Sequence, residues 1–448
     1  MMQKPLLIKI IAATVLALLA AGICLSAPAS GRSAPLSQMP ASAAAAQPPR
    51  TNRVLPGIDT LQMRAFRELK GKRVGLLTHP AGVNSQGLPT IDVLHKAPGV
   101  KLVALFGPEH GIRGDAKADV YVHDAIDAKT GLTVYSLYGK TRRPTAKMLE
   151  GIDTMVIDLQ DVGTRSYTYI SAMRYVMEEC FKEGKEVMIL DRPNPLGGLK
   201  VDGPPMDKEL ISYVGAYQIP YVYGLTIGEL ALMAKATPGW LDVPDKVRRS
   251  GRLSVIPMTG WRRDMLWHDT GLSWRATSPA IPDFSAAMGY PMTGLGCMQG
   301  GFVHGYGSNF PFRMLQFSGK RPEQIRAALL EERIPGLEYD VLPFQQNGKA
   351  HRGVYVIVNN WDTLRPTQLN LHLMKLAAQW ARESGKPNPF AALNADQALL
   401  FNKHMGSMEF WNALVRDGER IDIAAFIRKW DAEATRFREQ SRKYWLYK

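Results

Sequence analysis

Short apolar runs alternate with helical patterns along the chain from Val54 onward. Four of these runs have the length and composition of buried strands: Arg73–Leu77, Lys101–Phe106, Thr154–Ile157 and Glu186–Leu190. Between the last two runs, apolar residues recur at helical spacing: Ile170, Met173, Met177 and Cys180. Gly184 then ends this predicted helix. Strands that alternate with helices predict a parallel sheet with both faces covered, so we expect an α/β fold.

A second unit is predicted from about Ala276 to the C-terminus. It contains three amphipathic helices, at Arg321–Glu332, Thr367–Ser384 and Ile421–Tyr444, and a buried strand at Val354–Val358. Ser278–Ser308 is dense in Gly, Pro and aromatic residues, and is typical of a long loop region between domains. We therefore divide the folded chain into residues 54–275 and a smaller α/β domain at 276–448.

The N-terminal segment has the pattern of a secretory signal. Lys4 and Lys9 precede an uncharged apolar run from Ile10 to Leu25, and small residues follow at Ala27. We predict a signal peptide at 1–27, an Ala/Ser/Pro-rich linker at 28–53, and an exported protein of the periplasm or cell envelope with no stable membrane span after processing. An uncleaved anchor is the alternative.

Composition and charge narrow the class of protein. The 448 residues carry a formal net charge of +14, but the basic residues are scattered and form no nucleic-acid-binding motif. An exported basic protein fits anionic envelope material better. Neither zinc-ligand spacing, nor a phosphate-binding loop, nor a dinucleotide fingerprint is present, so we expect no metal and no cofactor.

The predicted strands all end in polar loops. In open α/β sheets, ligands bind outside the carboxyl ends of the strands. We therefore expect one crevice there, partly covered by 278–312. The polar groups that we expect around it are Glu109, His110, Arg113, Asp158, Gln160, Asp161, Arg165, Asp191, Arg192 and Asn194.

Glu109 is the leading candidate for a catalytic residue. It stands in the turn Gly107–Gly111, where a carboxyl group could donate a proton to a leaving oxygen. The alternative is a glutamate that caps the loop by accepting backbone hydrogen bonds. Glycosidases commonly add a second carboxylate, and Asp161 or Asp158 could supply it. Asp161 is preferred, because Asp158 closes a strand and is better explained as structural.

The remaining candidates would bind substrate. Arg165 and Arg192 could each hold a carboxylate through two hydrogen bonds, or instead pair with Asp158 or Asp191. Tyr167 could stack on a sugar ring. His110 could orient Glu109.

Several long segments resemble the NamZ family of exo-β-N-acetylmuramidases. They are Phe106–Gly114, Tyr135–Gly139, Asp158–Tyr169, Leu190–Pro195, Gly224–Leu230 and the closing Lys443–Tyr447. The resemblance implies a Rossmann-like N-terminal domain, a smaller C-terminal domain and a cleft between them. It also implies release of terminal N-acetylmuramic acid from peptidoglycan fragments. Glu109 would be the acid, supported by Asp161, Arg165, Tyr167 and Asn194.

One segment departs from the family pattern. Where the family has a Glu-Gly-Thr-Asn run and then a Gly-Arg-Gly-Thr run, this chain reads Gln299–Asn309, and a glutamate, an asparagine and an arginine of the family pattern are replaced. His79 and Tyr223 also replace other polar residues. The main hypothesis is an exo-acting glycosidase on muramic-acid-containing fragments. The alternative is a catalytically weak paralogue that binds cell-wall glycan.

Overall fold

The computed structural model describes residues 53–109, 111–113 and 124–448. The predicted signal peptide, the linker before Arg53, and His110 lie outside the described residues. Within these ranges, no helix combines the length and apolarity needed to cross a membrane.

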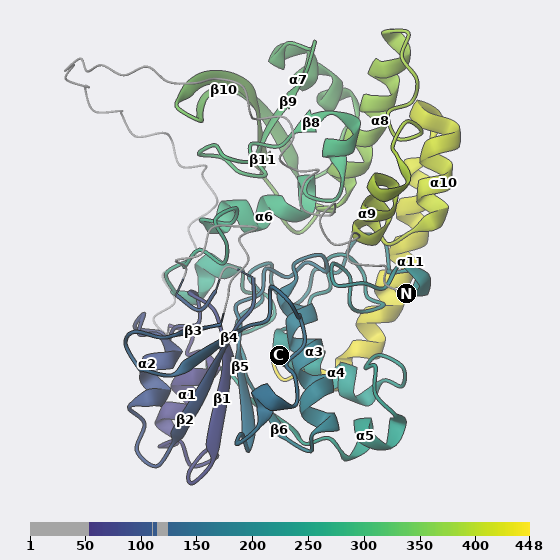
Figure 1. The fold of residues 1–448 in the computed structure, drawn as a ribbon. Coiled ribbons are helices and arrows are strands. Elements are labelled where there is room, and N and C mark those ends of the chain that lie inside the picture. Colours follow the sequence, from purple (N-terminus) through teal and green to yellow (C-terminus); the bar gives the residue numbers. More distant parts are fainter. Residues whose placement is uncertain (1–52, 110, 114–123) are drawn as a thin grey trace, which may run out of the picture. The chain divides into compact units, whose positions relative to one another are not determined.

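The N-terminal layer is built on a seven-stranded sheet (Figure 1). Its strands are β1 (Arg73–Thr78), β2 (Lys101–Gly107), β3 (Ala125–Ile126), β4 (Thr133–Ser136), β5 (Thr154–Asp158), β6 (Glu186–Leu190) and β7 (Leu253–Ile256). Their order is β3-β4-β2-β1-β5-β6-β7, and every neighbouring pair is parallel except β3 with β4. The four predicted strands and the parallel α/β class are confirmed. β4 and β7 are short and only partly buried, so no apolar run marked them in the sequence.

Helices cover both faces of this sheet. They are α1 (Gly57–Met63), α2 (Thr90–His95), α3 (Tyr169–Lys182), α4 (Ile227–Ala236) and α5 (Asp245–Ser250). α1 and α2 pack on one face, and α3 and α4 pack on the other, each with its own apolar core. The predicted apolar side of α3 is fully buried, including the free thiol of Cys180. Burial of apolar surface on both faces is the main stabilising term of such a sheet.

The C-terminal layer holds a four-stranded antiparallel sheet of order β10-β11-β9-β8. Its strands are β8 (Phe302–Val303), β9 (Met314–Phe317), β10 (Leu337–Gln346) and β11 (Lys349–Val358). Asn347 and Gly348 both have positive φ, of 52° and 74°, which gives the tight hairpin turn between β10 and β11. The predicted strand at Val354–Val358 lies within β11.

Six helices accompany this sheet: α6 (Phe284–Thr293), α7 (Pro322–Glu331), α8 (Gln368–Glu383), α9 (Ala395–Met405), α10 (Met408–Asp417) and α11 (Ile423–Ser441). The three predicted helices correspond to α7, α8 and α11. The prediction that 278–308 is loop throughout was wrong, because α6 lies inside it. The Asp283 side chain accepts a hydrogen bond from Ala286 N and so caps this helix, which contains Gly289 and Pro291.

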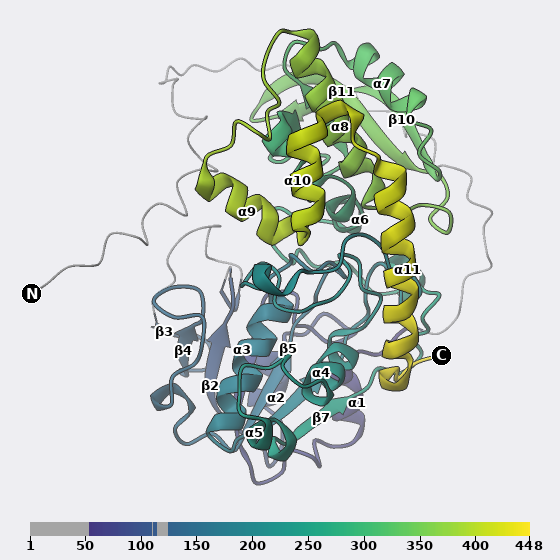
Figure 2. The same cartoon turned by 90° about the vertical axis from the view of Figure 1, so that its right-hand side faces the viewer.

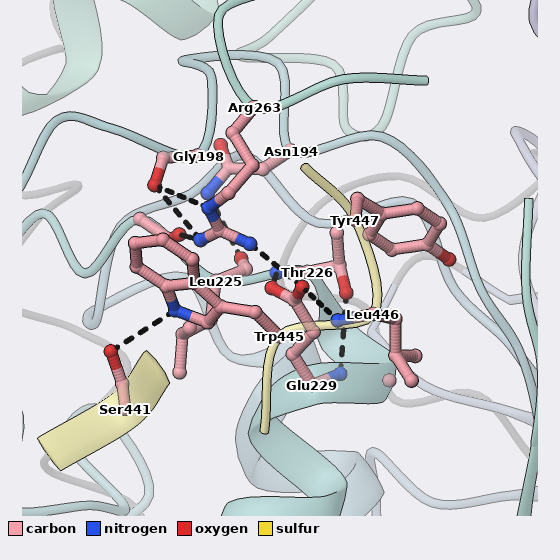
Figure 3. Close-up of polar contacts among 12 residues, drawn as sticks. Asn194, Gly198, Leu225, Thr226, Glu229, Arg263, Ser441, Trp445, Leu446 and Tyr447 are labelled. Atoms are coloured by element: carbon pink, nitrogen blue, oxygen red, sulfur yellow. Dashed lines mark hydrogen bonds and ion pairs between the residues drawn. The ribbon is translucent and has the colours of Figure 1, made fainter. Parts of the chain in front are cut away.

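The chain end returns to the N-terminal layer. α11 runs from α10 toward α4 and ends in a tail at Arg442–Lys448 (Figure 2). Glu229 of α4 forms a buried ion pair with Arg263 at 2.7 Å and also accepts a hydrogen bond from Leu446 N at 2.9 Å (Figure 3). The Arg263 guanidinium lies 3.8 Å from the centre of the Trp445 ring. The tail is therefore an integral part of the N-terminal core.

Tyr447 makes the deepest contact of this tail. Its hydroxyl donates to Asp191 Oδ2 at 2.6 Å and accepts from Met258 N at 3.0 Å. Asp191 directly follows β6, and burial raises its pKa to about 7. The hydrogen bond from Tyr447 therefore offsets part of the cost of burying this carboxyl group.

We predict that Tyr447→Phe lowers the free energy of unfolding by ~1–3 kcal/mol, because it leaves the buried Met258 N–H without a partner and leaves Thr226 Oγ1 as the one donor to Asp191 Oδ2 among the described residues. Denaturant unfolding measures this loss. Tyr444→Phe is the matched control, since its half-buried hydroxyl has no hydrogen bond to any described residue. Equal stability of the two variants would contradict the structural role of Tyr447.

Candidate active site

The carboxyl ends of the four predicted strands do lie side by side, because β2, β1, β5 and β6 are consecutive in the sheet. The expected single crevice is nevertheless divided. One cavity holds Glu109, and a second holds Arg192, and they share no lining residue. Just beyond the ends of β1 and β5, Gln160 N donates to His79 Nε2 at 2.9 Å and so joins the two strand-end loops.

The first of these, the Glu109 cavity, has a volume of about 300 Å³. Its wall is mainly aromatic and comes from both layers of the fold, as the resemblance implied. Its lining residues are Glu109, Tyr138, Arg142, Ser166, Tyr167, Thr168, Tyr169, Tyr213, Val214, Ser278, Pro279, Ala280, Ile281, Tyr290, Tyr306, Phe312 and His404.

Glu109 follows β2 and reaches the cavity as a half-buried side chain. Its Oε2 accepts a hydrogen bond from Thr168 Oγ1 at 3.2 Å. Thr168 directly precedes α3, so the rigid start of that helix orients the carboxyl group. No other carboxylate among the described residues lines this cavity.

Tyrosine hydroxyls hold the wall opposite Glu109 in place. Tyr167 Oη donates to Thr277 Oγ1 at 2.8 Å, and Ser166 Oγ lies 3.1 Å from Tyr290 Oη. Burial raises the pKa of Tyr290 to about 12, so this ring stays neutral at physiological pH. Neutral aromatic faces with fixed hydroxyls suit a sugar ring, which presents both C–H and O–H groups.

Asp161 is buried and lies outside the Glu109 cavity. Its Oδ2 accepts from Gly163 N at 2.7 Å and from the Tyr223 hydroxyl. Oδ1 is buried and has no hydrogen-bond partner in the described part of the chain. Burial raises the pKa of Asp161 to about 7. Asp161 lines instead a small cavity of about 10 Å³ together with Arg192 and Asn194.

Asp158 and Arg192 form a buried ion pair at 2.5 Å. Asp158 also accepts from Thr90 Oγ1 at 2.5 Å, and Arg192 Nη2 donates to Val83 O at 2.7 Å. Pairing with Asp158 or Asp191 is the alternative that the sequence offers to substrate binding by Arg165 or Arg192. Arg192 forms such a pair, with Asp158. Arg192 also lines the second cavity, of about 130 Å³, beside Arg275 and Gln160.

Arg165 is fully buried and spans the two layers of the fold. Its Nη atoms donate to four carbonyl oxygens: Pro204 at 2.6 Å, Ile219 at 2.7 Å, Met405 at 2.8 Å and His404 at 3.1 Å. It does not line the Glu109 cavity, so its contacts are those of a structural residue rather than of a substrate ligand.

Two other candidates also make protein contacts. Arg113 forms ion pairs with Asp127 at 2.6 Å and Asp92 at 3.4 Å. Asn194 donates to Leu225 O at 3.0 Å and accepts from Leu196 N at 3.0 Å. Of the predicted site residues that the structure describes, only Glu109 and Tyr167 line the Glu109 cavity.

Several cavity residues were missed from the sequence. Arg142 and Tyr138 follow β4, and Tyr213 lies in an irregular segment before α4. The alternation in Thr133–Ser136 could have marked β4, and with it the polar loop that follows. Nothing comparable marks Tyr213.

The divergent segment Gln299–Asn309 does reach the cavity, through Tyr306. Tyr306 O accepts from Gln346 Nε2 at 2.7 Å, which ties the segment to β10. His304 stacks on Phe312 with ring centres 4.6 Å apart, and burial lowers its pKa to about 4. The departure from the family pattern thus falls on the cavity wall. Across the described residues, no cluster of three His, Cys, Asp or Glu could hold a metal ion.

Comparisons with known proteins agree over nearly the whole folded chain. Residues 74–285 match the family model described as exo-beta-N-acetylmuramidase NamZ, N-terminal, and residues 288–447 match its C-terminal counterpart. The chain is 39% identical over 346 residues to the peptidoglycan beta-N-acetylmuramidase NamZ of Bacillus subtilis (strain 168), covering 75% of this chain and 81% of that protein.

Two crystal structures of DUF1343 family proteins from Bacteroides fragilis NCTC 9343 have a similar fold. The first has a TM-score of 0.79 at 38% identity and covers 88% of this chain and 99% of the other. The second has a TM-score of 0.60 at 25% identity and covers 89% and 99%.

Because the carboxyl group of Asp161 is buried, we expect the free energy of unfolding to depend on pH. Its pKa rises from 3.8 to about 7 on folding, so between these values unfolding releases a proton. The stability of the wild type should therefore fall as pH rises through this window. Asp161→Asn removes the titration, so its stability relative to the wild type should increase from pH 4.5 to 7.5.

Thermal unfolding across this pH range tests the expectation. Asp153→Asn serves as control, because the Asp153 side chain is 41% exposed and its ion pair with Arg73 lowers its pKa. A constant difference between Asp161→Asn and the wild type would mean that Asp161 is not a buried titrating acid.

Proposed function

The chain belongs to the NamZ family of exo-β-N-acetylmuramidases, and we propose that it is a peptidoglycan glycosidase that releases terminal N-acetylmuramic acid from the non-reducing end of fragments. The family is one of glycoside hydrolases, and the Bacillus subtilis relative is named for peptidoglycan and for N-acetylmuramic acid. The observation that carries this proposal is the position of Glu109. Among the described residues that line this cavity, which is rich in aromatic side chains, Glu109 is the only carboxylate.

Glu109 would act as the general acid. Thr168 donates to Oε2, which leaves Oε1 to carry the proton that passes to the leaving glycosidic oxygen. A cavity of about 300 Å³, with Tyr290 and 278–281 in its wall, fits one terminal sugar better than several units of a polymer. This size supports exo action.

The secretory signal predicted at 1–27 would direct the protein to the cell envelope. The net charge of +14 would favour approach to glycan that carries lactyl and peptide carboxylates. We therefore place the protein in the periplasm or cell envelope.

A weak wall-binding paralogue is the second candidate, and the divergent segment at Tyr306 favours it. Hydrolysis of a chromogenic β-N-acetylmuramide, beside the matching glucosaminide, separates the two. Binding of muramyl fragments without turnover would favour the paralogue.

We predict that Glu109→Gln folds normally, still binds product and loses at least ~100-fold in kcat on a natural fragment, because the amide cannot donate the proton. The loss should be smaller with an activated aryl leaving group, which needs little protonation. Glu150→Gln, an exposed and charge-matched change, should behave as the wild type.

A loop-capping glutamate would give another result. Its loss would lower the melting temperature and reduce turnover of both substrates alike. Wild-type turnover of the natural fragment by Glu109→Gln would remove Glu109 from the mechanism.

The export proposal has its own test. N-terminal sequencing of the mature protein from the envelope fraction should begin between Ala27 and Ala46. Recovery of the full-length chain from the cytoplasm would contradict export.

A further inference from the structure

The Glu109 cavity contains a single permanent positive charge among its described lining residues, the guanidinium of Arg142. His404, which also lines it, does not compete, because burial lowers the pKa of its imidazole to about 4. Glu109 and Arg142 follow neighbouring strands, β2 and β4 (Figure 1). One cavity thus offers an acid and a separate anion-binding group.

Aromatic rings hold Arg142 in place. Its Cζ lies 4.3 Å from the centre of the Tyr213 ring and 5.4 Å from that of Tyr138. Within the described ranges, no carboxylate lies within ion-pair distance of Arg142, and its N–H groups form no hydrogen bond to protein. The next residue is the reverse case, since Arg143 pairs with the buried Glu178 and with Glu179 at 2.9 Å.

Two arginines that the sequence suggested as anion ligands are already committed. Arg165 donates to four carbonyl oxygens, and Arg192 is paired with Asp158. Arg275 lines the second cavity instead. Among the described residues that line the Glu109 cavity, Arg142 is therefore the one positive charge with free donors.

The hydroxyl of Tyr213 supplies an independent observation. Tyr213 is only 8% exposed and lines the cavity, yet its Oη is buried without a hydrogen-bond partner among the described residues. Buried polar groups in proteins nearly always have a partner, so this hydroxyl is positioned for a ligand. Burial, together with the negative charge of Glu109, raises its pKa, which keeps it protonated as a donor.

We propose that Arg142 and the Tyr213 hydroxyl bind the carboxylate of the 3-O-lactyl group and so select N-acetylmuramic acid over N-acetylglucosamine. The inference rests on the proposed function and deepens it. The lactyl ether is the one group that the first sugar has and the second lacks. A guanidinium and a phenolic hydroxyl give a carboxylate charge-assisted hydrogen bonds.

The test compares kcat/KM for a chromogenic β-N-acetylmuramide with that for the matching β-N-acetylglucosaminide. Arg142→Gln should lower the muramide-to-glucosaminide ratio by ~10–100-fold, mainly through KM, as expected for a lost hydrogen bond to a charged group. Arg142→Lys should give an intermediate ratio, and Tyr213→Phe a smaller decrease. Lys140→Gln, which removes an exposed charge two residues away, should leave the ratio at the wild-type value.

The methyl ester of the lactyl group makes the assignment specific. For the wild type, kcat/KM should fall from the acid to the methyl ester by the same factor by which Arg142→Gln lowers kcat/KM for the acid. For Arg142→Gln, kcat/KM should be the same for the acid and the ester. Two results would overturn the assignment. One is an equal decrease in kcat/KM for the muramide and the glucosaminide in Arg142→Gln, and the other is an equal effect of the methyl ester on kcat/KM in the variant and the wild type.

Binding separates this proposal from the proposed function. Calorimetry should show that free N-acetylmuramic acid binds the wild type and binds Arg142→Gln at least ~10-fold more weakly. If the wild type turns over neither glycoside but binds in this Arg142-dependent way, the glycosidase proposal fails and the recognition proposal stands. If N-acetylmuramic acid binds both proteins equally, the recognition proposal fails.

Discussion

The buried ion pair between Asp158 and Arg192 is the interaction on which the arrangement of the site depends. It joins the carboxyl ends of β5 and β6, and its hydrogen bonds to Thr90 and Val83 extend it to the segment after β1. Removing either partner would leave an uncompensated charge in the core, which costs several kcal/mol. The Glu109 cavity and the second cavity lie at this edge of the sheet, and of these two the one with an acid among its described lining residues is the Glu109 cavity.

Most of the polar residues at this edge therefore serve the structure rather than the reaction. Arg165 joins the layers through carbonyl oxygens, and Asp161 lies under the wall with Tyr223. Their rigidity matters for the acid, because Thr168 lies in the same segment, three residues after Arg165, and its hydroxyl donates a hydrogen bond to Glu109. The chemistry is left to a small set of groups on a fixed aromatic wall. Among the described residues, the divergent segment contributes Tyr306 to that wall.

The sequence predicted the parts of the fold that depend on local pattern. The strands before Thr78, Gly107, Asp158 and Asp191 are continuous apolar runs, and α3 has a clear helical period. The sequence pattern did not predict α6, because glycine and proline are unusual inside a helix. In the site, Glu109 could be found from its turn. Arg165 could not be separated from a substrate ligand, because its four acceptors are main-chain carbonyls without any sequence signature. Arg142 and Tyr213 meet only through the tertiary fold.

The tail at Arg442–Lys448 has a consequence for folding. Tyr447 and Leu446 supply partners to Asp191 and Glu229, two acids that lie over 200 residues earlier in the chain. Contacts between residues so far apart in sequence require the closure of a long loop, which costs conformational entropy before any hydrogen bond forms. The N-terminal layer therefore completes its core only when the tail docks on it.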